Sequence, residues 1–369
     1  MKKILFASSA LVAVAAAGTA QASEPIKLSV GGYMEQWAGV ADQDVGESKN
    51  AFQSDTEVHF SGATTLDNGI EVGAKIELEG ETSGDQIDEQ YLYVSGGFGQ
   101  VRLGKDDSAA DAMGVTAPSV GPVGVNDGDL TNWVDAYLID TVPSSGDQNR
   151  LTYYTPVFGG FRLGASYADD SQRNGSNNYN GTDGNGDEIV SAGVEFRHDF
   201  DGIALGVSAT GENWGEGNWY GLGATVGFGN FVVGSSWGHI EDDYAQGENS
   251  RTAGDTDSYD IGVSYAMDAA TVSLSYAYSE YGNRTDGSTT TSGEISTVDL
   301  GMAYTLGAGV AWKSSIFWFD DEADRVRLYE AVYESDTWKN EIAPKIPDML
   351  DRDRIVVTRI EPTSKSVTH

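Results

Sequence analysis

Cysteine is absent from all 369 residues, so no disulfide can hold this fold together. Basic residues are scarce: 22 Lys and Arg stand against 57 Asp and Glu, which gives a formal net charge of −35. That balance argues against nucleic acid as a partner, because neutralising phosphates requires a basic surface. Beyond the N-terminal segment, no apolar run approaches the roughly 20 residues that a membrane-spanning helix needs.

The first 22 residues have the pattern of a secretory signal peptide. Lys2 and Lys3 precede an apolar run over residues 4–17, and the small-x-small sequence Ala-Gln-Ala closes at residue 22. The run is too short and has the wrong flanks for a spanning helix. We therefore predict export and a mature chain that begins at Ser23.

Aromatic residues are plentiful, with 18 Tyr, 8 Trp and 12 Phe, which is too many for an acidic disordered chain. Apolar residues alternate with polar or small ones in many short segments, as in residues 70–78. Period-two alternation gives a strand one apolar face. It predicts fifteen up-and-down strands, at residues 26–40, 53–65, 69–79, 88–96, 100–105, 149–157, 161–168, 188–199, 203–211, 217–228, 231–239, 257–267, 271–279, 295–305 and 309–319.

The connections between these strands alternate in length. Tight turns occur at 66–69, 96–99, 158–160, 199–202, 227–230, 267–270 and 306–309, and long polar segments separate them. A soluble β-sandwich or propeller would also have alternating strands but has no reason to alternate its loops. Short turns at one end and long loops at the other are typical of a transmembrane β-barrel of the outer membrane.

Two segments resemble the general porins of Gram-negative bacteria, closest to the α-proteobacterial type. They are GGFGQVRLG, beginning at Gly96, and TPVFGGFRLGASY, beginning at Thr155, and the resemblance extends over residues 23–320. It implies an all-β, antiparallel, sixteen-stranded barrel that forms homotrimers in outer-membrane lipid. It also implies a water-filled channel for ions and small hydrophilic solutes, not an enzyme, with a third external loop folded inward to narrow the pore.

The third long segment, residues 106–148, is the longest internal connection, and long loops in compact folds are usually functional. It carries apolar residues suited to packing inside a lumen, among them Met113, Val115 and Trp133. Its acidic side chains are the predicted constriction-loop residues: Asp106, Asp107, Asp111, Asp127, Asp129, Asp135 and also Asp140.

Four cations are predicted to line the facing wall. Lys75, Arg102 and Arg162 each lie between two apolar residues, and Arg150 shares this phase. A cation on the lipid face of a barrel costs about 2–4 kcal/mol at the membrane midplane, so these side chains should point into the lumen. They could form a basic wall opposite the acidic loop, or be ordinary lumen charges solvated by pore water.

The net acidity favours cations over anions, because an acidic mouth concentrates counter-ions. Two other readings of the function stay open: a non-conducting structural or adhesive barrel, and a truncated chimeric porin that does not assemble. A weak calcium candidate lies in an external loop, where four oxygen-bearing side chains have the spacing of the first ligands of a calcium loop. They are Asp183, Asn185, Asp187 and Glu188.

Residues 321–369 read differently from everything before them. From Ala323 the apolar period changes toward that of a helix, and residues 354–360 again suggest a strand. From about residue 316 the chain resembles the C-terminal half of a NIPSNAP-type α+β domain. We therefore predict a short α+β tail in place of the last barrel strand; the alternative is a porin with an unusual last loop.

Overall fold

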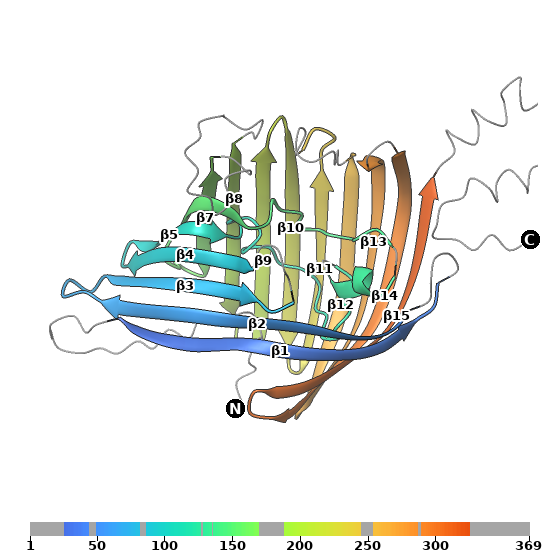
Figure 1. Ribbon diagram of the computed structural model, residues 1–369, viewed down its shortest axis with the longest axis horizontal. Helices are drawn as coiled ribbons and strands as arrows, with labels where there is room; N and C mark the ends of the chain where they lie inside the picture. Colours follow the sequence, from blue (N-terminus) through green and yellow to red (C-terminus); the bar gives the residue numbers. More distant parts are fainter. Residues whose placement is uncertain are drawn as a thin grey trace, which may run out of the picture.

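The computed structural model describes residues 26–43, 49–81, 86–126, 128–134, 136–169, 188–244, 254–286 and 289–324. They form one antiparallel sheet of fifteen strands, in which every strand pairs with its neighbours in the sequence (Figure 1). The predicted all-β fold class is confirmed. The strands are β1 (Lys27–Ala41), β2 (Lys49–Thr65), β3 (Glu71–Glu79), β4 (Ile87–Gly96), β5 (Gly99–Asp106), β6 (Gln148–Tyr154), β7 (Phe161–Ala168), β8 (Ile189–Asp199), β9 (Ile203–Trp214), β10 (Gly217–Phe228), β11 (Phe231–Ile240), β12 (Thr256–Met267), β13 (Ala270–Asp286), β14 (Thr289–Gly307) and β15 (Val310–Asp324).

Each predicted strand corresponds to one observed strand, but several are longer than predicted. The clearest case is β15, which was expected to leave the sheet near Asp320. Its ladder with β14 continues to Asp324, which pairs with Ser292. β15 therefore extends four residues past the boundary predicted at residue 320, because backbone groups continue to pair after the apolar alternation has ended.

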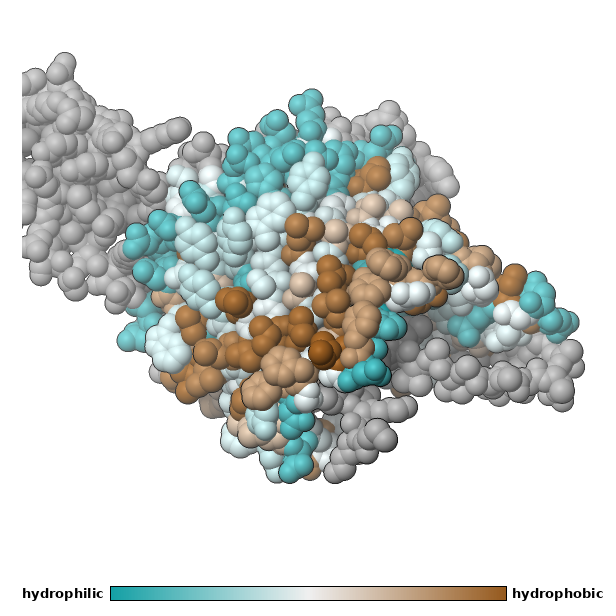
Figure 2. Space-filling model, turned by 180° about the vertical axis from the view of Figure 1, so that it is seen from behind, coloured by the Kyte–Doolittle hydropathy of each residue, from teal (hydrophilic) through white to brown (hydrophobic). Residues whose placement is uncertain are grey.

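The two faces of the sheet differ as the alternation predicts. Apolar side chains on the outer face are widely exposed, and they gather in a band across the molecule with polar residues above it (Figure 2). The cations are flanked by such outward leucines: Leu103 is 61% exposed, Leu163 52% and Leu151 50%. The opposite, inner face carries small, polar and charged residues.

The packed interior lies between the inner face of the sheet and the segment that connects β5 to β6, residues 107–147, called here the third loop. Its buried residues include Met113, Leu130 and Trp133, which belong to apolar clusters with side chains of the strands. A 3-10 turn, η1 (Asp129–Asn132), is part of this loop. In the described ranges, no helix has the length and apolar character needed to cross a membrane.

The sheet curls until its two end strands approach each other (Figure 1). Lys313 Nζ in β15 lies 3.4 Å from Glu35 Oε1 in β1. Because fifteen strands alternate in direction, β1 and β15 run the same way. Among the described residues, no backbone ladder joins them, and their contact is made by side chains.

Candidate functional site

The third loop runs along the inner face of the barrel and is held there by its own backbone. Its amide N–H groups donate hydrogen bonds to serine hydroxyls on five strands. The bonds run from Ala109 to Ser166 (3.2 Å), Ala110 to Ser191 (3.4 Å), Val115 to Ser208 (2.9 Å), Val120 to Ser273 (3.0 Å) and Val123 to Ser315 (3.2 Å). We call these five serines, on β7, β8, β9, β13 and β15, the serine track.

Inward glycines make room for the same loop. A Cβ at Gly193 would lie 3.1 Å from Met113 Sδ, and one at Gly262 would lie 2.8 Å from the Pro118 oxygen. A Cβ at Gly223 would overlap the carbonyl oxygen of Val115. Since any side chain there would displace the loop, these glycines form a shallow groove that fits its backbone.

The predicted loop carboxylates occupy different surroundings. Asp106 ends β5, is buried, and pairs with Arg102 at 3.1 Å. Asp111 accepts a hydrogen bond from Ser144 at 2.8 Å, within the loop itself. Asp129 accepts one from Asn132 at 2.9 Å in η1. Asp127 and Asp135 lie outside the described residues.

Two carboxyl groups lie where the third loop leaves β5 and returns to β6. Burial, and then the neighbouring Asp111, raise the pKa of Asp107 to about 8. Burial, followed by the charges of Asp107 and Asp88, raises the pKa of Asp147 to about 8. Both carboxyl groups also lie within 4.8 Å of an oxygen of Glu89. These two groups therefore retain part of their protons at neutral pH.

The structure brings two of the four predicted cations together around one tyrosine. The Arg102 guanidinium lies 5.3 Å from the ring centre of Tyr154, and that of Arg162 lies 5.1 Å from it. Arg162 Nε also pairs with Glu195 Oε1 at 2.6 Å. Each guanidinium thus has a carboxylate and an aromatic face as partners, and its charge is largely balanced locally.

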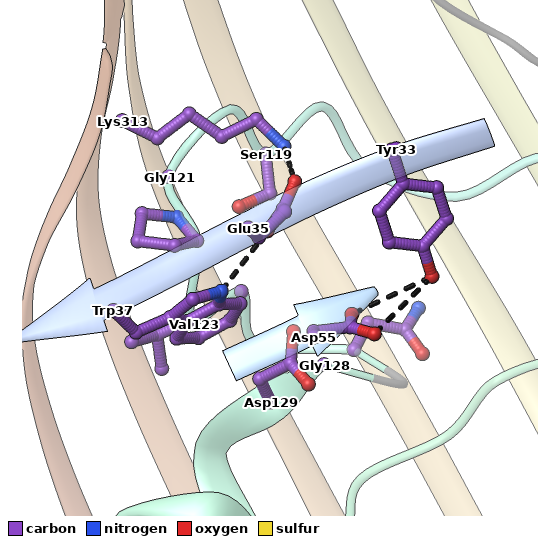
Figure 3. Close-up of a pocket in the computed structure, with 13 residues that line it drawn as sticks. Tyr33, Glu35, Trp37, Asp55, Ser119, Gly121, Val123, Gly128, Asp129 and Lys313 are labelled. Carbon is purple, nitrogen blue, oxygen red and sulfur yellow. Dashed lines mark hydrogen bonds and ion pairs between the residues drawn. The ribbon is translucent and has the colours of Figure 1, made fainter. Parts of the chain in front are cut away.

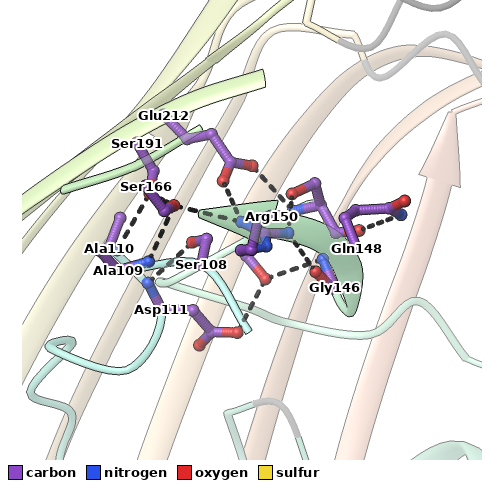
Figure 4. Close-up of polar contacts among 12 residues, drawn as sticks. Ser108, Ala109, Ala110, Asp111, Gly146, Gln148, Arg150, Ser166, Ser191 and Glu212 are labelled. Atoms are coloured by element: carbon purple, nitrogen blue, oxygen red, sulfur yellow. Dashed lines mark hydrogen bonds and ion pairs between the residues drawn. The ribbon is translucent and has the colours of Figure 1, made fainter. Parts of the chain in front are cut away.

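Arg150 points inward as predicted, but it is buried beneath the returning end of the third loop (Figure 4). It donates to the Gly146 carbonyl at 2.6 Å and to Ser145 Oγ at 3.0 Å. Its guanidinium lies 3.7 Å from Glu212, and both side chains are at most 1% exposed. Arg150 therefore anchors the loop end to β9.

Lys75, the fourth predicted cation, lies in an acidic environment. Its ammonium group contacts Glu77 and lies 3.2 Å from Glu89. Inward carboxylates extend from it across the first four strands, and those of Asp55, Glu79 and Glu81 have oxygens within 4.8 Å of one another. We call these carboxylates, together with the exposed Glu81 just past the end of β3, the acidic wall: Glu35, Asp55, Glu57, Glu77, Glu79, Glu81, Asp88 and Glu89.

The acidic wall could hold cations at several points. Glu57, His59 and Glu77 offer ligand atoms within 4.8 Å of one another, as do Glu57, Glu79 and Asp88. His59 Nε2 lies 3.0 Å from Glu57 Oε2. Carboxylate oxygens are the ligands that hard divalent cations such as Ca²⁺ take in proteins.

A cavity of about 360 Å³ opens between the acidic wall and the third loop (Figure 3). Glu35, Asp55 and Asp129 give it carboxylates, Tyr33 and Trp37 line it with rings, and the Lys313 ammonium lies at its edge. Tyr33 donates to Asp55 at 3.4 Å, and Trp37 Nε1 donates to Glu35 at 3.1 Å. The lining combines charged and aromatic groups, with acids in excess.

The acidic wall, the serine track and the glycine groove that holds the loop were not predicted from the sequence. The acidic wall could have been predicted in part, since acidic residues occupy alternate positions at residues 55–57 and 77–81, which places them on one face of a strand. Inward serines and glycines look like ordinary small residues of a strand and carry no such signal. Asp183, Asn185 and Asp187 of the calcium candidate lie outside the described residues, and Glu188 is exposed just before β8.

Comparison with known proteins agrees with this architecture. The family described as Gram-negative porin matches residues 7–324. The chain belongs to the Gram-negative porin family. It is therefore placed in the outer membrane, in a family of channel proteins rather than enzymes. The match ends at Asp324, the last residue of β15. The first four residues of the predicted tail, 321–324, therefore belong to the barrel, and residues 325–369 lie outside the described residues. The family comparison does not support the NIPSNAP resemblance predicted from residue 316.

One curated relative of this porin is the "Outer membrane porin protein 32" of Delftia acidovorans. It is 29% identical over 192 residues, which cover 47% of this chain and 51% of the relative. The chain thus matches about half the length of that relative.

Solved structures share the fold. The "Anion-selective porin from Comamonas acidovorans" has a TM-score of 0.56 and 19% identity, covering 81% of this chain and 90% of its own. OmpT of Vibrio cholerae, solved in a trimer form, has a TM-score of 0.56 and 14% identity, covering 82% and 90%.

Proposed function

We propose that this porin forms a water-filled, cation-preferring channel for ions and small hydrophilic solutes, narrowed by the third loop. The observation that carries the proposal is the charge of the lumen. The acidic wall faces a loop that is itself acidic, while the inward cations at positions 75, 102, 150 and 162 each have a carboxylate partner. Charged side chains that line a pore set its ion selectivity.

The narrowing by the third loop is supported by its course along the inner face. A segment seated on the serine track from β7 to β15 takes up lumen space along much of the wall. The carboxylates of Asp55 and Asp129, which line the same cavity, are then close enough to act on one passing ion. Their shared field would attract cations and repel anions.

The name of the Comamonas structure calls it anion-selective, which is the opposite preference. At 19% identity the likeness concerns the fold, and selectivity depends on which charges line the lumen. The paired arginines of this chain leave the acidic wall as the main uncompensated charge. We therefore infer that its preference is for cations.

A salt gradient across a planar bilayer tests the proposal. We expect single-channel steps and a reversal potential of the sign that cation permeation produces. Replacing Asp55→Asn, Glu57→Gln and Glu79→Gln together should move the reversal potential toward zero, because three lumen charges are lost. A reversal potential showing anion preference in the unmodified protein would contradict the proposal, and a folded barrel without conductance would favour the structural alternative.

The chain offers a matched control for that triple change. Asp67, Asp201 and Asp268 lie in or beside the short turns, away from the acidic wall, and each can be replaced by Asn. The last two have positive φ values of 51° and 46°, which Asn tolerates. This variant loses the same total charge, so the reversal potential should stay at the wild-type value if lumen position decides selectivity.

We further propose that the protein assembles as a homotrimer in outer-membrane lipid. Support comes from the trimer form of the OmpT structure and from the apolar band on the outer face. Chemical cross-linking of the detergent-extracted protein should give a three-chain species. Calcium binding at residues 183–188 and an α+β tail also stay proposals, tested by calorimetry with Ca²⁺ and by helical circular dichroism of the tail peptide.

A further inference from the structure

The ends of the sheet pose a problem in a membrane. β1 and β15 run in the same direction and, among the described residues, share no backbone ladder. Unpaired N–H and C=O groups are costly in hydrocarbon, so an open seam there would be unfavourable. One surface ion pair, Lys313 to Glu35 at 3.4 Å, is a weak link because the lysine side chain is 45% exposed.

The third loop touches the β1 side of this seam. The indole of Trp133 stacks on that of Trp37, with ring centres 6.5 Å apart and planes 18° from parallel. A Cβ at Gly39 would lie 2.5 Å from the Trp133 ring, so this glycine lets the indole rest on the β1 backbone. Beside it, the Gln53 amide of β2 donates to the Asn132 carbonyl at 3.0 Å.

The same loop segment touches the β15 side. The Val123 amide donates to Ser315 Oγ at 3.2 Å, and the Tyr137 amide donates to Asp321 at 3.1 Å. Phe317 and Phe319 of β15 pack on a buried apolar cluster that contains Val123, Leu130, Trp133 and Val134 of the loop. Trp37 of β1 packs on this cluster too, so one group of loop side chains contacts both end strands.

We propose that the described residues of the third loop between 119 and 137, namely 119–126, 128–134 and 136–137, form a strap that holds β1 to β15 from inside the barrel. The cluster around Trp133 is its clamp on β1, and the two amide bonds fasten it to β15. The strap closes the seam through side chains and loop amides where the strands share no ladder. It follows that the segment lining the cavity in Figure 3 cannot swing away from the wall without opening the barrel.

The matched pair Trp133→Ala and Met113→Ala tests the strap in the full-length protein folded in detergent. Both side chains are at least 96% buried in the same loop, but Met113 packs near β7 and β8, at Gly164 and Gly193. The readout is amide hydrogen exchange, which reports local opening. We expect Trp133→Ala to speed exchange in β1 and β15 at least roughly tenfold, as loss of the indole contacts implies, and Met113→Ala to spare both strands.

A second measurement uses the ion pair across the seam. A carbodiimide should join Glu35 to Lys313 as an amide, with loss of one water, and mass spectrometry detects the linked peptides. The yield should fall several-fold in Trp133→Ala but not in Met113→Ala. If the alanine variant does not fold, Trp133→Leu, which keeps an apolar side chain, should show the same changes at smaller size.

Exchange in β1 and β15 that is equally slow in wild type and in both Trp133 variants, with undiminished cross-linking, would overturn the strap. So would faster exchange of equal size in every strand, since that means general destabilisation. Neither result bears on the proposed cation preference, which depends on the acidic wall and is read separately from the reversal potential.

Discussion

The course of the third loop makes a prediction that one methyl group can test. Gly223 faces inward in β10, and a Cβ there would overlap the carbonyl oxygen of Val115. In Gly223→Ala the loop must move off the wall toward the pore axis. The Val115 amide would then lose its 2.9 Å hydrogen bond to Ser208.

The expected cost combines two effects. Overpacking a close contact costs about 1–3 kcal/mol, and loss of one buried hydrogen bond costs about 1 kcal/mol more. The free energy of unfolding, measured by urea titration in detergent, should fall by roughly 2–4 kcal/mol. Single-channel conductance should also fall, because a loop pushed inward narrows the lumen.

Gly227→Ala is the control. Gly227 lies on the same face of the same strand, and the atom nearest to its added Cβ would be Ala204 Cβ at 3.4 Å, an ordinary contact. Stability and conductance should stay at wild-type values in this variant. If Gly223→Ala behaves like Gly227→Ala in both assays, the loop does not lie against β10 in the folded protein, and the reasoning from the glycine groove fails.

Two further predictions concern titration and buried charge. Asp107 and Asp147 have pKa values of about 8 in the folded state, above the ordinary value of about 4. The folded protein therefore holds these protons more tightly than the unfolded chain does. The stability that this provides is complete at acidic pH and is lost as pH rises toward 8. Glu89, Asp88 and Asp111 face the same two groups, so negative charge added there is opposed by like charges. Between pH 6 and 9 the reversal potential should shift further toward the value for cation permeation. The shift should be smaller in the double variant Asp107→Asn/Asp147→Asn. Arg150→Ala should lower the free energy of unfolding by about 3–5 kcal/mol, since it leaves Glu212 buried without its cation. Arg150→Met/Glu212→Gln should recover much of that loss, and Lys313→Ala, at an exposed pair, should cost less than about 1 kcal/mol.

Period-two alternation predicted the number, order and facing of the strands, because one lipid-facing side per strand leaves a direct mark on the sequence. Strand ends were predicted less well. β13 runs to Asp286 where the alternation indicated an end at 279, since polar strand ends pair through the backbone whatever side chains they carry. Near residue 323 the apolar period changes toward that of a helix, so the sequence pattern gave no sign that β15 continues to Asp324.

The sequence predicted which face of the sheet the site residues occupy, but not which residues they contact. The phase of Arg150 next to Leu151 correctly places the guanidinium on the inner face. That it lies beneath the loop end, beside Glu212, depends on how β6 and β9 curve in space, which no local pattern records. The serine track was equally hidden, because a serine that accepts a loop amide looks like any inward serine.

The serine track also bears on how such a channel can change over generations. The barrel strands contribute serine hydroxyls and glycines. The loop contributes mostly its backbone amide groups, which every residue except proline possesses. Substitutions along residues 109–123 therefore leave most of these anchors in place. The loop can acquire new side chains toward the lumen while its backbone keeps its course, so the position of the loop can be inherited separately from its side-chain chemistry.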